Sequence, residues 1–220
     1  MNSVRIIGGE WRRRVLRFPE AIGLRPTPDR VRETLFNWLG QDLSGLNCLD
    51  LFAGSGALGF EAASRGAAQV VLVEQSPAVC AALSRNASSL LGTPDVTNAP
   101  SKPITPGAQR LHIVRSDALK FASTTRQQFD LLFLDPPYAQ GWIEKITPWL
   151  ARRLTATARI YAESEAPLES CGDWHTVRRG KAGQVFYHLM QRNSDAPLRA
   201  NGQNELLAPP AAPHAWSNSD

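Results

Sequence analysis

The sequence predicts an α/β fold with a mostly parallel sheet, preceded by a short basic extension. From Asn47 onward, short apolar runs alternate with helical patterns, which is typical of parallel sheets covered by helices. A glycine-rich turn joins the first of these runs to a helix. Residues 1–40 differ in texture, because they hold eight arginines and four acidic residues and so account for the whole net charge of +4.

Composition divides the 220 residues into three segments. We expect an extension over 1–40, a main domain over 41–190 and a disordered tail over 191–220, which is rich in Pro, Ala and Asn. With 220 residues, 43% of them hydrophobic, the chain is long enough for one good-sized domain with a substantial core. A proline-rich stretch over 92–110 has no apolar period and is expected to be a surface insertion.

The extension is predicted to form a hairpin and a helix. Residues 4–7 and 15–18 are short alternating segments around a Gly-Gly turn, which favours a β-hairpin. Thr27 is a suitable N-cap and Pro28 suits the first helical position. Apolar residues then repeat every four positions, so we expect an amphipathic helix that ends near Gly40.

In the main domain, strands and helices are expected to alternate. The closing pair is expected to be an antiparallel hairpin attached to the otherwise parallel sheet. The predicted strands are 48–52, 69–73, 111–115, 130–134, 159–163, 174–179 and 184–190, and the predicted helices follow the glycine turn to about 65 and cover 77–91 and 142–153.

Several classes of protein are disfavoured. Cys48, Cys80 and Cys171 are far apart, with no metal-ligand spacing, which argues for a reducing cytoplasm and against disulfides or a metal site. The sequence has no apolar signal core and no long apolar run, so secretion and membrane spanning are not expected.

The glycine turn predicts a nucleotide-type cofactor. Gly54-x-Gly56-x-x-Gly59 lets the backbone approach a ligand at a helix N-terminus, although a tight turn without a ligand has the same spacing. Glu74, at the end of the second strand, is placed to accept hydrogen bonds from ribose hydroxyls. Asp50 would oppose a pyrophosphate but would attract the amino group of a methionine moiety. This favours S-adenosylmethionine over NAD.

The run Asp135-Pro136-Pro137-Tyr138 follows a buried strand and ends it, because proline cannot donate to a sheet ladder. Ligands of open α/β sheets bind at this end of the strands. The Asp135 carboxylate and the Pro136 carbonyl can accept two N–H bonds from an exocyclic amine, and Tyr138 can stack on its base. A proline-rich strand stop with an incidental acid is the weaker alternative.

The arginines of the extension suggest nucleic acid, since arginine binds phosphate bidentately and stacks on bases, although a merely soluble basic surface would have the same charge. Trp11 is expected either to stack on RNA or to anchor the hairpin, and the three arginines that follow it favour RNA. The candidate RNA-binding residues are Arg5, Trp11, Arg12, Arg13, Arg14 and Arg30.

Taken together, the run from Asp50 to Gly59, Glu74, Asp117 and the run from Asp135 to Tyr138 resemble the motifs of class I S-adenosylmethionine-dependent methyltransferases. The stretches 5–14 and 24–38 narrow the resemblance to the bacterial 16S ribosomal RNA guanine-N2 methyltransferases of the guanine-966 type. The similarity covers about residues 4–190. It implies a Rossmann-like, mostly parallel seven-stranded sheet with an antiparallel closing strand and helices on both faces.

The resemblance also implies roles for individual residues. Asp135, Pro136, Pro137 and Tyr138 would hold the target guanine, and Asp117 would bond the adenine of the cofactor. The full set of implied contacts to S-adenosylmethionine is Arg25, Thr27, Asp50, Phe52, Ala53, Gly54, Ser55, Gly56, Glu74, Asp117 and Ala118.

The sequence therefore predicts methyl transfer to guanine N2 of 16S RNA by a cytoplasmic monomer, without a metal. The RNA is expected to lie in the 30S subunit or an assembly intermediate. Three alternatives remain open: methylation of adenine N6 in DNA, a non-catalytic RNA-binding assembly factor, and an NAD oxidoreductase. The Asp-Pro-Pro-Tyr motif does not itself separate guanine from adenine.

Overall fold

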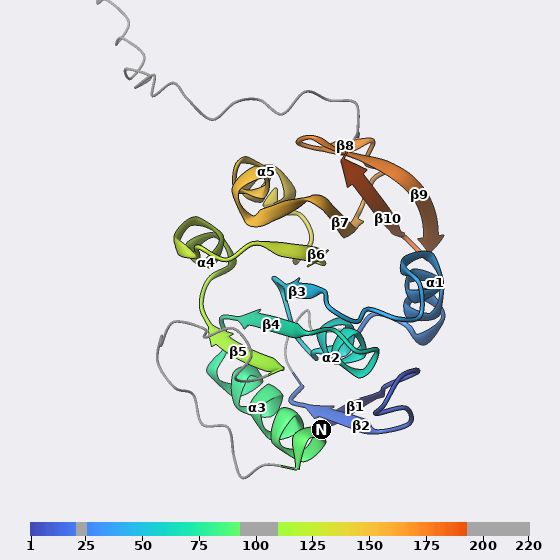
Figure 1. Ribbon diagram of the computed structural model, residues 1–220, viewed down its shortest axis with the longest axis vertical. Helices are drawn as coiled ribbons and strands as arrows, with labels where there is room; N and C mark the ends of the chain where they lie inside the picture. The colour runs from blue at the N-terminus through green and yellow to red at the C-terminus, as the bar shows by residue number, and fades with distance from the viewer. Residues whose placement is uncertain (21–25, 93–109, 193–220) are drawn as a thin grey trace, which may run out of the picture.

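A computed structural model of the chain describes residues 1–20, 26–92 and 110–192 (Figure 1). Arg25, nearly all of the proposed insertion over 92–110 and nearly all of the proposed tail over 191–220 lie outside these residues. Within the described ranges, no helix combines the length and apolar character needed to cross a membrane.

The described elements follow the predicted order closely. The strands are β1 Asn2–Arg5, β2 Val15–Phe18, β3 Asn47–Asp50, β4 Gln69–Glu74, β5 Leu111–Arg115, β6 Phe129–Leu134, β7 Leu154–Ser164, β8 Ser170–Cys171, β9 Trp174–Ala182 and β10 Val185–Arg192. The helices are α1 Asp29–Leu39, α2 Ala57–Ser64, α3 Pro77–Leu91, α4 Ala118–Thr124 and α5 Trp142–Arg153.

In the described part of the chain, the main sheet has the order β5-β4-β3-β6-β7-β10-β9-β8. The first five strands are parallel, and β10 and β9 close the sheet as an antiparallel hairpin. This confirms the predicted α/β sheet, with β8 as an eighth strand of two residues beyond the seven expected. The strand order reverses beside β3, which is where open α/β sheets bind ligands.

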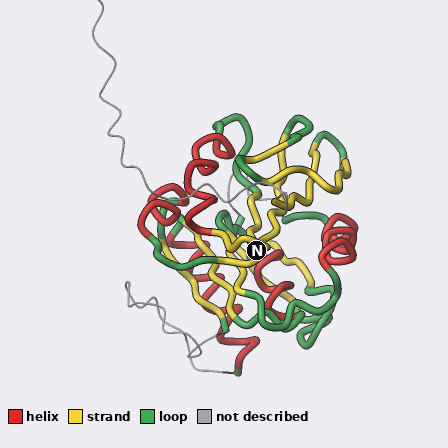
Figure 2. The backbone as a smooth tube through the Cα atoms, turned by 45° about the horizontal axis from the view of Figure 1, so that its top comes forward, coloured by secondary structure: helices red, strands yellow, loops and turns green. Residues whose placement is uncertain are grey.

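Helices cover both faces of the sheet, so its central strands read as continuous apolar runs rather than alternating ones (Figure 2). On one face, α1, α2, α3 and the β1–β2 hairpin pack over one apolar cluster, and on the other α4 and α5 pack over a second. The helix α4 was not predicted, because its seven residues are too few to show a helical period.

The β1–β2 hairpin is tied to α2 by one buried acid. The fully buried Glu61 carboxylate accepts hydrogen bonds from the backbone N–H groups of Ile7, at 2.7 Å, and Gly8, at 2.8 Å. It also forms ion pairs with Arg32 on α1 and Arg65 at the end of α2. The hairpin therefore packs against the main domain, as expected for a two-stranded unit that is marginal alone.

The start of α1 differs from the prediction. The helix begins at Asp29, and Pro28 occupies the N-cap position without a side-chain cap hydrogen bond. Thr27 does not cap the helix, because its hydroxyl lies 3.4 Å from Oδ2 of Asp135 instead. The predicted capping role of Thr27 is therefore wrong, and the tertiary contact explains why.

Candidate active site

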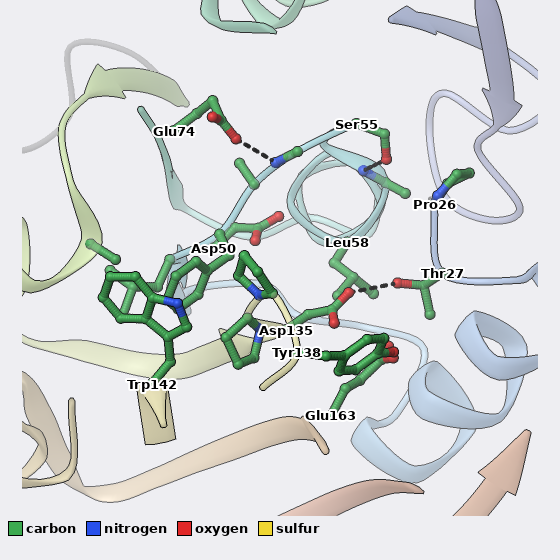
Figure 3. A pocket seen from close by; sticks show the side chains of 18 of the residues that line it. Pro26, Thr27, Asp50, Ser55, Leu58, Glu74, Asp135, Tyr138, Trp142 and Glu163 are labelled. Carbon is green, nitrogen blue, oxygen red and sulfur yellow. Dashed lines mark hydrogen bonds between the residues drawn. The ribbon is translucent and has the colours of Figure 1, made fainter. Parts of the chain in front are cut away.

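One cavity of about 1100 Å³ opens at the carboxyl ends of the parallel strands (Figure 3). Its walls come from the ends of β3, β4, β6 and β7, the segment before α1, and the turn between β9 and β10. This volume is at the upper end for a single small-molecule pocket, which leaves room for two ligands side by side. Of the predicted site residues that the structure describes, the cavity lining includes Thr27, Asp50, Phe52, Ala53, Gly54, Ser55, Glu74, Asp117, Ala118 and Asp135 to Tyr138.

The glycine turn lies along one wall between β3 and α2. Gly54 and Gly56 have φ angles of 48° and 77°, a left-handed conformation that glycine adopts without strain. A Cβ on Gly56 would also lie 2.5 Å from the Phe60 ring, so packing requires glycine here as well. Gly56 is not in the cavity lining, and its predicted cofactor contact stays a prediction.

Glu74 at the end of β4 is held by backbone groups on both sides. Its Oε2 accepts from the N–H of Gly54 at 3.1 Å, and its Oε1 accepts from the N–H of Ser76 at 2.8 Å. The side chain is only half-buried and faces the cavity in Figure 3. These bonds fix a carboxylate at the strand end where a ribose would bind in this class of fold.

Asp50 lies deeper in the site, at the end of β3. Its Oδ2 accepts a hydrogen bond of 3.0 Å from the N–H of Gly59, the third glycine of the turn. Burial, with a smaller contribution from the Glu74 charge, raises the pKa of Asp50 to about 7. A buried carboxylate of this kind becomes favourable when a cationic group binds beside it.

Asp117 and Ala118 line the cavity just after the end of β5. Asp117 is exposed, and its Oδ1 caps α4 by accepting from the N–H of Lys120 at 2.9 Å. Ala118 is buried at the first position of α4. Sequence reasoning identified both residues without the helix that positions them.

The Asp-Pro-Pro-Tyr run follows the end of β6 at Leu134 and lines the cavity. Asp135 is half-buried and Pro136 is buried, whereas Pro137 is exposed and Tyr138 is 48% exposed. Burial and the charges of Glu163 and Asp50 raise the pKa of Asp135 well above its ordinary value. An exposed ring beside a half-buried carboxyl group suits a planar ligand that stacks with one face and hydrogen-bonds with one edge.

Sequence reasoning missed several residues of the cavity wall. Glu163 is the penultimate residue of β7 and lies beside Asp135, and Tyr187 lies on β10. Trp142 begins α5, with its ring edge-on to that of Phe52 and the two ring centroids 5.2 Å apart. The prediction that a strand ends at Glu163 was available from sequence. The order β6-β7, which places that end next to Asp135, was not.

The proposed RNA-binding residues are distributed over two edges of the sheet. Arg5 borders a smaller hollow of about 300 Å³ that shares Pro26, Thr27 and Pro28 with the main cavity, and the exposed Arg30 lies on the first turn of α1. The loop of 9–14 lies at the far end of α2, since the N–H of Glu10 bonds the carbonyl of Ser64. Arg5 therefore lies in a hollow next to the main cavity, and Arg30 lies between the lining residues Pro28 and Val31 in sequence, whereas the second group lies at the other end of α2.

In that loop, Arg12 and Arg13 are exposed, and Arg14 donates to the carbonyl of Ser89 on α3. Trp11 is only 5% exposed and packs in the core, with the Arg110 guanidinium 4.9 Å from its ring centroid. The expectation that Trp11 stacks on RNA is therefore wrong, because the indole anchors the hairpin. The other expected contacts in this set stay predictions.

Comparison with known proteins places the chain among methyltransferases. A family model described as "Conserved hypothetical protein 95" matches residues 4–191. The ribosomal RNA small subunit methyltransferase D of Escherichia coli K12 is 41% identical over 205 residues, which cover 91% of this chain and 96% of that protein. Its namesake from Haemophilus influenzae is 37% identical, over 86% of this chain and 94% of that protein.

Solved structures agree with this. The Escherichia coli protein yhhF superposes with a TM-score of 0.72 at 41% identity, covering 87% of this chain and 98% of the other. An RNA methyltransferase from Salinibacter ruber, solved with S-adenosyl-L-homocysteine, has a TM-score of 0.56 at 16% identity, which shows a shared fold alone. The sequence and structural matches lead to one conclusion: this chain belongs to the family of ribosomal RNA small subunit methyltransferase D proteins.

Proposed function

We propose that the chain transfers a methyl group from S-adenosylmethionine to the exocyclic N2 of a guanine in 16S ribosomal RNA. The observation that carries the proposal is that Asp135 and Pro136 both line a cavity large enough for a cofactor and a base. The names of the relatives, which are ribosomal RNA small subunit methyltransferases, support the RNA substrate.

The residues of the cavity fit S-adenosylmethionine in chemical type. Glu74 suits the ribose hydroxyls, and the backbone around Gly54 suits close approach of the methionine end. The buried Asp50 has no cationic partner among the described residues and suits the amino group of the cofactor. When bound, this cofactor supplies a methyl group on a sulfonium, which is electrophilic.

The protein would act by orientation and charge. The lone pair of a guanine amine is delocalised into the ring, so the amine is a poor nucleophile. Asp135 and the Pro136 carbonyl would accept its two N–H bonds, aim the nitrogen at the methyl group and stabilise the positive charge that develops there. The bound cofactor would supply the methyl group, with an N–C bond forming as the C–S bond breaks, and Asp135, as an acceptor of the amine, would take the proton that the methylated nitrogen loses.

The exposed Tyr138 ring would stack on the flipped guanine. Arg5 and Arg30 would contact phosphates near the cavity, and Arg12, Arg13 and Arg14 would contact phosphates farther away. We propose that the chain acts as a monomer in the cytoplasm, on RNA within the small subunit or an assembly intermediate.

The test is mass-spectrometric mapping of 16S RNA from cells that lack the chain. Naked RNA and 30S particles are incubated separately with the protein and S-adenosylmethionine. We expect one additional methyl group on one guanine base, at N2. Methyl transfer only to adenine in DNA would contradict the proposal, and so would binding of NAD without binding of S-adenosylmethionine.

A further inference from the structure

Glu163 lies beside Asp135 on the same face of the sheet. The strands β6 and β7 are parallel neighbours in which Phe133 pairs with Tyr161 and Leu134 with Ala162. The Phe133 and Tyr161 rings touch edge-on, with centroids 6.4 Å apart, so these side chains share a face. Asp135, the first residue after β6, and Glu163 on β7 each lie two residues beyond this pair, so continuing the strand alternation places their side chains next to each other on that face. Figure 3 shows both carboxylates at the cavity.

The Glu163 carboxylate is built into the site. It is 5% exposed, and its Oε1 accepts a hydrogen bond of 2.7 Å from the buried Tyr161 hydroxyl. No Lys or Arg of the described residues forms a salt bridge with either Glu163 or Asp135. Burial raises the pKa of Glu163, while hydrogen bonds from Tyr161 and, to a smaller extent, Thr27 oppose that rise. Two adjacent carboxyl groups, one buried and one half-buried, are costly for stability without a cation, which points to a functional reason for their presence.

A guanine presents three N–H bonds along one edge. Two belong to the exocyclic N2, and the third belongs to the adjacent ring nitrogen N1. Asp135 and the Pro136 carbonyl provide acceptors for the two N–H bonds of N2. A third acceptor is required next to Asp135, because an unpaired N–H in a buried site is unfavourable.

We propose that Glu163 is the substrate-recognition residue that accepts the N1–H of the target guanine. This rests on the proposed function. A purine without a hydrogen on N1, such as adenine, would place the N1 lone pair against the Glu163 oxygens. The site would then hold two facing acceptors, so such a base is rejected. Glu163 thereby supplies the choice of base that the Asp-Pro-Pro-Tyr motif does not make.

The probe base is 2-aminopurine, which keeps the exocyclic 2-amine but has a lone pair in place of the N1–H. Two versions of the 16S RNA are prepared, one with guanine and one with 2-aminopurine at the mapped target position. They are used as naked RNA or assembled into 30S particles, according to which of these two substrates the mapping experiment shows to be methylated. For each protein variant, kcat/KM is measured on both RNAs. 2-Aminopurine also lacks the guanine O6, but that difference is the same for every variant and cancels when the guanine-to-aminopurine ratios are compared.

The informative variant is Glu163→Gln, since its amide can donate to the bare N1 of 2-aminopurine. We expect the wild type to favour guanine by at least about 100-fold, in line with sites whose buried polar groups lose a partner. In Glu163→Gln, kcat/KM on guanine falls by about 30-fold or more and the ratio narrows to within about tenfold. Glu165→Gln, an exposed residue two positions on, is the matched control and keeps the wild-type ratio.

Binding of S-adenosyl-L-homocysteine to each variant verifies that the cofactor half is intact. If Glu163→Gln does not fold, Tyr161→Phe replaces it, because it removes the hydroxyl that orients Glu163. We expect that variant to narrow the ratio severalfold. An unchanged ratio in a folded variant overturns the proposal, including the case in which activity falls equally on both bases. A wild type that methylates no guanine at all contradicts the proposed function instead.

Discussion

The two edges of the sheet carry charge in opposite ways. At the carboxyl edge, Asp50, Asp135 and Glu163 are withdrawn from water and have raised pKa values. At the amino edge, Arg12 and Arg13 are exposed and form no salt bridge with the described residues. Carboxyl groups that are withdrawn from water without a paired cation are typical of a site of chemistry, whereas exposed arginines suit attraction of, and contact with, an anionic partner.

Asp135→Ala should have the largest effect on activity. The variant loses a hydrogen-bond acceptor and the charge that stabilises the developing cation, so kcat should fall by about 10³-fold or more. Binding of S-adenosyl-L-homocysteine, followed by calorimetry, should be retained. Methylation at the wild-type rate would remove Asp135 from the mechanism.

Glu61→Gln tests the contact that joins the hairpin to the main domain. Removing one partner of a buried ion-pair network leaves Arg32 and Arg65 short of countercharge. The free energy of unfolding should therefore fall by about 3–5 kcal/mol, measured by urea denaturation.

Glu10→Gln is the matched control for Glu61→Gln, because Glu10 pairs with Arg110 on the exposed side of the same hairpin. It should cost less than about 1 kcal/mol. Equal losses of unfolding free energy in the two variants would show that the buried ion-pair network contributes no more to stability than the exposed pair does.

Asp50→Asn should change how stability depends on pH. The folded-state pKa of Asp50 is about 7, above its ordinary value of 3.8, so the folded protein holds this proton more tightly than the unfolded chain does. Stability from this group is present below about pH 4 and is lost as pH rises to about 7, with a slope of up to about 1.4 kcal/mol per pH unit.

Asparagine does not titrate, so in the absence of cofactor the free energy of unfolding of the Asp50→Asn variant should decline less between pH 4 and 7 than that of the wild type. The pKa values of Asp135 and Glu163 are also raised, so the stability of the variant should still decrease with pH to some extent. A pH profile that matches the wild type would contradict the assignment of this slope to Asp50.

Replacing the arginine pairs at the two edges of the sheet should have modestly different effects on RNA affinity. Replacing Arg5 and Arg30 by Ala should weaken RNA binding about tenfold at 0.1 M salt and lower the slope of log K against log salt by about 1.5. The pair Arg12 and Arg13 should change affinity by less than about threefold if the RNA is held mainly near the cavity. The reverse order would move the main RNA contact to the amino edge.

The local patterns of this sequence were sufficient for most of the fold. The bounds of α3, β5 and α5 match the predicted ranges, because each has a clear apolar pattern and, for α3, a proline at its first position. The motif residues at strand ends were also identifiable, since an apolar run that stops at an acidic residue or a proline can be recognised from the sequence alone.

Other assignments depended on contacts between distant segments. Thr27 has the local chemistry of a helix cap, yet it bonds Asp135 across 108 positions. Trp11 is followed by three arginines, as an RNA-binding aromatic residue would be, yet the Arg110 guanidinium lies over its ring. No local rule distinguishes these outcomes, because the competing partner is supplied by another part of the chain.

The sequence by itself determined an α/β methyltransferase fold, a glycine turn for a cofactor and an amine-holding strand end. Only the tertiary structure decided which arginines lie at the cavity end of the sheet and that Glu163 lies beside Asp135. The physical reason is that secondary structure and strand ends follow from near neighbours in sequence. Strand order, burial and the pairing of side chains across strands follow from the packing of the whole sheet.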